Sequence, residues 1–144
     1  MAKLELYGFE DLDAAFARIA DIPFEVTEDA LDAMAEVAVD KIRSTGESMG
    51  VRDPESDVHI LDKLKRAKAK QTRDGGYEAI TFEGSRTRNG RKTRNAEIAF
   101  VNEFGKDGQP ARQFIGTGMA RNEEEIADPG AKVIGDWIEN EFQR

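Results

Sequence analysis

The chain has 144 residues, 39% of them hydrophobic and 35% charged, which is typical of a single globular domain, here residues 1–144. It contains no cysteine, which excludes disulfides, thiolate catalysis and cysteine-based metal sites. No apolar run approaches the roughly 20 residues that span a bilayer, and the start MAKLELYGFE lacks the apolar core of a secretory signal. We therefore expect a protein that folds in a cytoplasm and has no membrane partner.

The net charge of −8 is divided unevenly along the chain. The segment from Lys63 to Arg94 holds 11 basic and three acidic residues, a net charge of +8, so the remainder carries −16. The basic segment of one copy can therefore attract the acidic body of another. This division of charge favours self-assembly.

In chain order, the first predicted elements are a strand and two helices. Leucines alternate with polar residues over 3–7, which predicts a short strand. Apolar residues from Leu12 to Ile19 follow helical spacing. The clearest helix is predicted over 28–45, with Thr27 as its N-cap and Gly46 as its C-terminal stop.

The middle of the chain predicts a loop and a hairpin. Residues 46–57 have loop composition, and the apolar residues of 60–64 predict a short helical or strand-entry segment. Strands are predicted near 66–72 and 76–83, and the Asp74-Gly75-Gly76 turn would join them as a hairpin.

Residues 84–95, GSRTRNGRKTRN, form a basic arm with almost no apolar content and two turn signals. Burial cannot offset the entropy lost on ordering such a segment. We therefore predict a mobile loop, or an extended hairpin tip, until a partner binds it. Its candidate interface cations are Arg86, Arg88, Arg91, Lys92 and Arg94.

The segment after the arm predicts a strand, a turn and two helices. A strand is predicted over 96–103, because Ile98, Phe100 and Asn102 alternate with Ala99, Val101 and Glu103 as in a half-buried strand. Gly105 and Pro110 then redirect the chain. A helix is predicted over 112–127, and Asp128-Pro129 would restart a last helix over 129–142. No catalytic side chain stands at the junction between strand and helix.

These elements predict an α+β domain. A small, mainly antiparallel sheet would be packed by the long helix and the C-terminal helix, with the basic arm projecting as a loop or hairpin.

The junction carries a family resemblance in the order of its motifs. A strand-like segment ends in Glu103, Phe104 and Gly105, a turn follows, and Arg112 and Phe114 precede a C-terminal amphipathic helix. This order resembles the small tail-component proteins of long-tailed bacteriophages, the gene-product-ten family of phage Hong Kong 97, and is similar to minor tail protein Z of lambda. One departure is Gln113, where members of the family typically have proline.

The resemblance implies a phage or prophage structural protein of the virion neck or tail end, assembled in the bacterial cytoplasm. Such a protein would act in tail completion and head–tail joining without catalytic turnover. Its partners would be copies of itself in a closed ring, together with neighbouring neck and tail-tube proteins.

Candidate catalytic and metal-binding residues have simpler explanations. His59 is the only histidine, so a zinc site has no ligand set. Glu123, Glu124 and Glu125 are consecutive in a predicted helix and point in different directions, which favours a solvated face over a Mg²⁺ or Ca²⁺ site. The glycine-containing turns lack phosphate-binding spacing, and Glu103 has no placed second carboxylate. We therefore predict no enzyme, cofactor, metal or small-molecule substrate.

The basic arm and the two phenylalanines remain open to more than one interpretation. The arm could contact a neighbouring subunit, contact DNA passing through the neck, or be a solvated loop; a nucleic-acid-binding accessory protein is the alternative function. Without aromatic residues, the arm is poorly suited to single strands. Phe104 would cap the sheet and Phe114 would anchor the last helix on it, or both would flank a surface that a ring neighbour covers. Gly105 would adopt a backbone angle that favours glycine.

Overall fold

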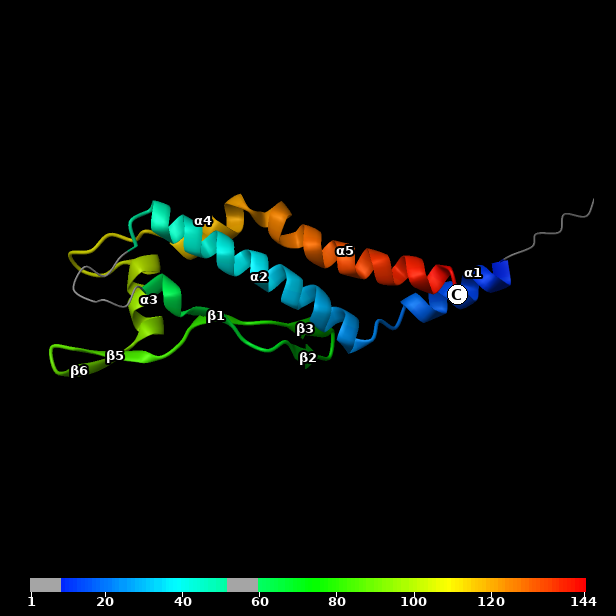
Figure 1. Ribbon diagram of the computed structural model, residues 1–144, viewed down its shortest axis with the longest axis horizontal. Coiled ribbons are helices and arrows are strands. Elements are labelled where there is room, and N and C mark those ends of the chain that lie inside the picture. Colours follow the sequence, from blue (N-terminus) through cyan, green and yellow to red (C-terminus); the bar gives the residue numbers. More distant parts are fainter. Residues whose placement is uncertain (1–8, 52–59) are drawn as a thin grey trace, which may run out of the picture.

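A computed structural model of the chain describes residues 9–51 and 60–144. The molecule is elongated and has three layers along much of its length (Figure 1). The C-terminal helix α5 (Glu123–Phe142) packs on the long helix α2 (Phe24–Ser48), and a ribbon of short strands packs on α2 as well. The predicted α+β class is confirmed, with α2 as the middle layer.

The remaining elements are short. The other helical elements are α1 (Phe9–Ile19), the single 3-10 turn η1 (Ile60–Lys63), α3 (Asn95–Phe104) and α4 (Phe114–Arg121). The strands are β1 (Leu64–Arg66), β2 (Lys70–Thr72), β3 (Gly75–Tyr77), β4 (Ile80–Phe82), β5 (Ser85–Arg88) and β6 (Arg91–Arg94). In the part of the chain that the structure describes, they pair only as antiparallel two-stranded ribbons: β1 with β4, β2 with β3 and β5 with β6. The strand expected over 3–7, residues 52–57 of the expected loop and His59 lie outside the described residues.

Helix α2 is longer than the sequence predicted at both ends. It begins at Phe24, so Thr27 lies inside its first turn and is not the N-cap. It continues through Gly46 to Ser48, so Gly46 is not its stop. A Cβ on Gly46 would lie 2.8 Å from Cδ2 of Leu61, which means that this glycine permits close packing inside the helix. The predicted apolar face is present, and its buried members are Ala30, Ala35, Ala38, Val39 and Ile42.

The C-terminal helices break at a different place from the one predicted. The break falls at Asn122, whose side-chain Nδ2 donates a hydrogen bond of 2.8 Å to the carbonyl of Gly118 at the end of α4. Helix α5 starts at Glu123 and runs through Pro129, so the predicted restart at Pro129 is wrong. The packing of α5 along α2 outweighs the one hydrogen bond that a proline removes from a helix.

The predicted hairpin is present as one antiparallel ribbon with an interruption. Thr72 pairs with Gly75 across the two-residue turn Arg73-Asp74, so Gly75 and Gly76, which were predicted in the turn, lie in β3. Leu64 pairs with Phe82 at the other end. Between the two paired regions, the Ala67 amide donates to the Ala79 carbonyl at 2.8 Å. The two paired regions therefore form one antiparallel ribbon, although each strand is short.

The hydrophobic core lies at the end of the molecule where α2, α3, α4, η1 and the ribbon meet. Phe114 is its centre: the side chain is 0% exposed, and its ring packs edge-on against Phe82 with 6.1 Å between ring centroids. Its other fully buried members are Ile42, Val51, Ile60, Leu61 and Leu64. Phe114 therefore anchors the short helix α4 in the core. The sequence had predicted it near the start of a longer helix.

One ionisable side chain is buried between the ribbon and α2. The Glu78 side chain is 1% exposed, and its Oε1 lies 3.8 Å from Nη1 of Arg66, which also donates to Asp32 of α2 at 3.0 Å. Burial raises the pKa of Glu78 to about 7, and the adjacent Asp32 carboxylate adds to the rise while Arg66 opposes it. Glu78 is therefore protonated in the folded protein at mildly acidic pH.

Phe114→Ala should lower the free energy of unfolding by roughly 3–5 kcal/mol, because it removes a fully buried aromatic ring and leaves a cavity. Trp137→Ala should cost less, because Trp137 is only half-buried. Chemical denaturation of both variants measures the difference. If both variants lost the same free energy of unfolding, Phe114 would not be the centre of the core.

Glu78→Gln should change how stability depends on pH. The folded chain holds the Glu78 proton up to about pH 7, whereas an unfolded glutamate releases it near pH 4.5, so stability falls as pH rises through this window. The amide is neutral at every pH, so the variant should gain stability relative to the parent between pH 5 and pH 8. Denaturation at both pH values tests this, with Glu83→Gln, an exposed carboxyl on the same ribbon, as the control. A gain that does not change with pH would contradict the assignment.

Candidate assembly surface

The basic arm folds as the β5–β6 hairpin and projects from one end of the molecule (Figure 1). Asn89 and Gly90 form its turn with φ angles of 51° and 75°, the left-handed pair that a two-residue hairpin turn requires. Of the two forms predicted for the arm, the hairpin is the one found. Arg91, Lys92 and Arg94 are exposed, and Arg88 lies opposite Arg91 in the strand register.

The base of the hairpin is attached to α3 through Asn95. This side chain is 2% exposed, and its Nδ2 donates to the Glu83 carbonyl at 2.8 Å. Its Oδ1 accepts a hydrogen bond of 2.9 Å from Nε of Arg86. Arg86 is half-buried and belongs to this attachment, so it differs from the exposed cations with which the sequence had grouped it.

Arg94 makes an ion pair at the junction of β6 and α3. Its Nε lies 3.1 Å from Oε1 of Glu97, one turn along the chain, and both side chains are mostly exposed. Exposed pairs of this kind are worth about 0–1 kcal/mol, so Arg94 remains free to exchange partners on binding.

The segment predicted as a strand over 96–103 is the helix α3, which corrects the sequence interpretation. Its buried residues are Asn95, Ala99, Asn102 and Glu103, a helical spacing. Three of these four are polar, while Phe100 and Phe104 are 61% and 64% exposed. The buried face of α3 is mostly polar, and its exposed face carries aromatic side chains. The apolar residues of this segment therefore do not repeat at helical spacing, and their alternation in the sequence predicted a strand.

Glu103 caps the following helix, α4. Its side chain is buried, and its two carboxylate oxygens accept hydrogen bonds from the amides of Ile115 at 2.7 Å and Gly116 at 3.0 Å. The amides of a helix's first turn have no partner within the helix, and a negative charge is favourable there. The buried Glu103 carboxylate is therefore paired with the first amides of α4, and these hydrogen bonds fix the angle between α3 and α4. The sequence did not predict this role for Glu103.

The turn between α3 and α4 is held by Asn102 and Arg112. The Arg112 amide donates to the Asn102 carbonyl at 2.8 Å, and Arg112 Nη1 donates to Asn102 Oδ1 at 2.6 Å. Gly105 has a φ of 79°, as the sequence predicted, and a Cβ there would lie 2.7 Å from the Ala111 nitrogen. The residues that carry the family resemblance therefore form one braced junction.

Phe104 lies on the surface of this junction and does not cap a sheet. Its ring packs against Phe100 with 4.7 Å between centroids. A shallow groove of about 470 Å³ runs beside it, lined by Gln113 and by residues of α3 and α4 that include Thr117, Ala120 and Arg121. An exposed aromatic pair beside a groove is a feature of interaction surfaces.

The described parts of the chain hold neither a metal-binding cluster of acidic, His or Cys side chains nor a helix that could span a membrane. No group of three or more His, Cys, Asp or Glu side chains among the described residues is placed to hold a metal ion. No described helix is both long enough and apolar enough to cross a bilayer. Glu123, Glu124 and Glu125 are exposed in the first turn of α5.

In comparisons with known proteins, the chain matches no family model, no curated protein and no solved structure.

Glu103→Ala should destabilise the fold by roughly 1–3 kcal/mol, because it leaves two helix-end amides without their acceptor. Glu103→Gln keeps one acceptor oxygen and should cost less. Glu97→Ala, on the exposed face of the same helix, is the matched control and should change stability by about 0.5 kcal/mol or less. Urea denaturation measures all three. A Glu103→Ala variant as stable as the control would show that the cap does not hold the junction.

Proposed function

We propose that this chain is a phage or prophage structural protein of the virion neck or tail end. It acts in tail completion and head–tail joining by binding alone, and its copies associate into a ring that contacts neighbouring neck and tail-tube proteins. The family resemblance of the segment from Glu103 to Phe114 suggests this assignment, and the braced junction is consistent with it.

The observation that carries the proposal is the placement of the exposed cations. Arg91, Lys92 and Arg94 stand on a projecting hairpin whose base is fixed to the body by Asn95. Outside the segment from Lys63 to Arg94 the chain carries a net charge of −16. A cationic projection on an acidic body suits repeated contacts between identical copies, because each copy offers both halves of the contact.

The second candidate is a nucleic-acid-binding accessory protein that uses the same hairpin. Its exposed cations could contact phosphates, which require charge and little shape. Residues 85–94 contain no aromatic side chain on which a base could stack, and the acidic body would repel a polyanion. A salt titration with duplex DNA separates the candidates, because phosphate binding weakens steeply as salt increases.

Replacing Arg91, Lys92 and Arg94 together by serine should leave the melting temperature nearly unchanged, because exposed charges contribute little to folding. The same variant should fail to join heads to tails when it is supplied to a phage that lacks the wild-type gene. Electron microscopy should then show filled heads separate from tails.

The matched control replaces Lys68, Lys70 and Arg73 by serine, which removes three exposed positive charges from the ribbon at a distance from the hairpin. If the hairpin variant gave normal infectious particles, the hairpin cations would not be needed for assembly. Equal defects in both variants would point to net charge and not to position.

A further inference from the structure

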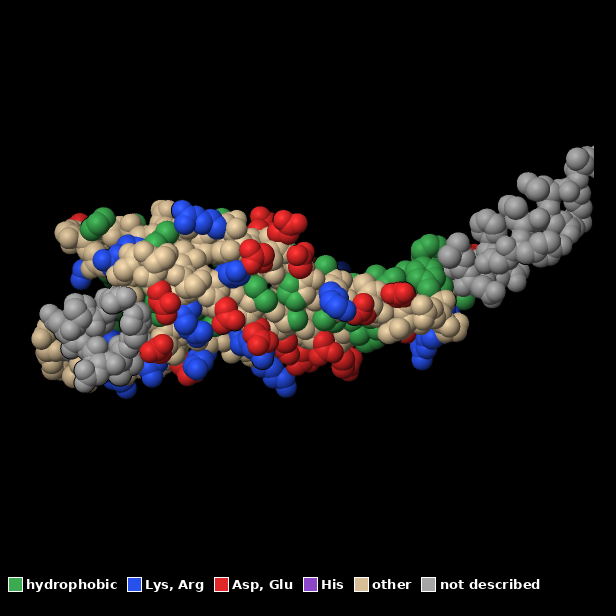
Figure 2. Space-filling view, turned by 45° about the horizontal axis from the view of Figure 1, so that its top comes forward, with side chains coloured by type: hydrophobic (Ala, Val, Ile, Leu, Met, Phe, Trp, Pro, Cys, Tyr) green, Lys and Arg blue, Asp and Glu red, His purple; other side chains and the backbone are tan. Residues whose placement is uncertain are grey.

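Two exposed aromatic pairs lie at opposite ends of the elongated molecule. Phe100 and Phe104 of α3 pack against each other with tilted rings, and α3 lies at the end that carries the hairpin. Phe16 of α1 and Phe142 of α5 pack edge-on at the other end, with 5.7 Å between ring centroids, and they are 50% and 42% exposed. Figure 2 shows hydrophobic side chains gathered at this second end. Each pair leaves apolar surface in water that a partner could cover.

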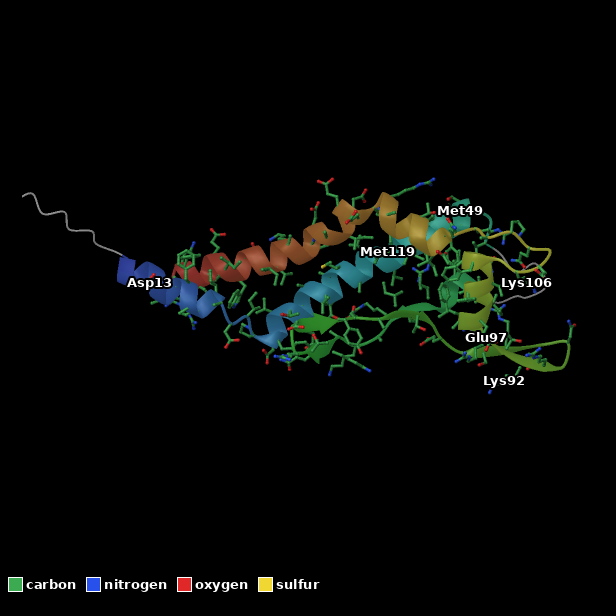
Figure 3. All side chains as sticks on the ribbon, turned by 180° about the vertical axis from the view of Figure 1, so that it is seen from behind. Asp13, Met49, Lys92, Glu97, Lys106 and Met119 are labelled. Carbon is green, nitrogen blue, oxygen red and sulfur yellow. The ribbon has the colours of Figure 1, made fainter. Side chains whose placement is uncertain are left out.

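The segments that carry the two aromatic pairs have opposite net charge. Residues 85–113, which form the hairpin, α3 and the turn after it, have seven basic and three acidic residues, a net charge of +4. Helix α1 together with residues 135–144 has six acidic and two basic residues, a net charge of −4. In Figure 3, Lys92 and Lys106 lie at the first end and Asp13 lies at the second.

Local ion pairs sharpen this contrast. At the second end, Arg18 and Arg144, its two basic residues, both pair with Glu141, so its basic groups are already engaged. Asp13 and Glu139 are exposed there. At the first end, Lys92 and Arg91 are exposed, and the groove beside Phe104 has Arg121 in its lining.

These observations decide how two copies can meet. Pairing the α3 ends of two copies would cover both aromatic pairs but would bring two positive surfaces together, and pairing two α1 ends would bring two negative surfaces together. Pairing the α3 end of one copy with the α1 end of the next covers both aromatic pairs and joins opposite charges. Like charges in contact oppose binding, so the unlike pairing is favoured.

We infer that the Phe100–Phe104 surface of one copy binds the Phe16–Phe142 surface of a second copy of this chain. The aromatic side chains supply the buried contact, and the surrounding charges set its orientation. The contact is heterologous, because it joins two different surfaces. In a pair of copies, each copy keeps one surface unused, and a further copy can bind there. The inference rests on the proposed function only in its requirement for self-association.

Cysteine cross-linking tests the contact directly, because the native chain has no cysteine and every disulfide must come from an introduced residue. Ala120→Cys places an exposed thiol in the groove beside Phe104, and Gln143→Cys places one next to Phe142. Under mild oxidation, a mixture of the two single variants should form a disulfide-linked heterodimer. Each variant alone should form little dimer, and the yield from the mixture should fall as salt increases.

Two further variants examine the aromatic part of the contact. Phe104→Ser in the Ala120→Cys chain should abolish the heterodimer, because it removes half of the exposed aromatic pair. Tyr77→Ser in the same chain is the control, because Tyr77 is an exposed aromatic residue on β3, away from both ends, and its loss should leave the yield unchanged. Melting curves of all variants confirm that they fold.

Three results would overturn the inference: a homodimer of Ala120→Cys as abundant as the heterodimer, no disulfide in the mixture, or equal loss with Phe104→Ser and Tyr77→Ser. Failure of the proposed function has a different signature. In that case the heterodimer would form in purified protein, but a phage carrying Phe104→Ser would still join heads to tails normally.

Discussion

The end of the molecule that holds the core depends on the hydrogen bonds of one buried carboxylate. This carboxylate belongs to Glu103 and lies between the end of α3 and the start of α4. It accepts hydrogen bonds from two amides of the first turn of α4, so it sets where α4 begins and how it leaves α3. Phe114 lies at the start of α4 and fills the centre of the core. The carboxylate thereby connects the junction to the packing of α2, the ribbon and η1.

Burying polar residues on α3 has a consequence for the surface. Asn95, Asn102 and Glu103 occupy the inner face of this short helix and are satisfied by hydrogen bonds to the hairpin base, the turn and α4. Phe100 and Phe104 therefore stand on the outer face, and α3 lies at the same end of the molecule as the hairpin. The same arrangement that braces the junction creates the aromatic and basic surface from which we infer self-association.

Sequence patterns predicted those elements whose signals are local. The Asn89-Gly90 pair predicted the turn of the basic arm, the Asp74-Gly75-Gly76 stretch predicted a hairpin whose turn lies at Arg73-Asp74, and the apolar stripe predicted the long helix α2. The patterns failed where contacts distant in sequence decide the structure. Helix α3 is held by its buried polar side chains, and α5 passes Pro129 because it packs along α2. Glu103 caps amides that lie 12 and 13 positions further along the chain, so no short sequence motif could predict the cap.

Opposite net charge on the segments around the two aromatic pairs is the physical basis of the self-association that we infer. A salt-dependent attraction between unlike ends allows each copy to bind a second copy while leaving further ends free. Sedimentation velocity over a range of protein and salt concentrations tests this central claim most directly. The account predicts association that proceeds beyond the dimer at low salt and weakens as salt increases. Association that stops at a dimer, or that salt does not change, would contradict it.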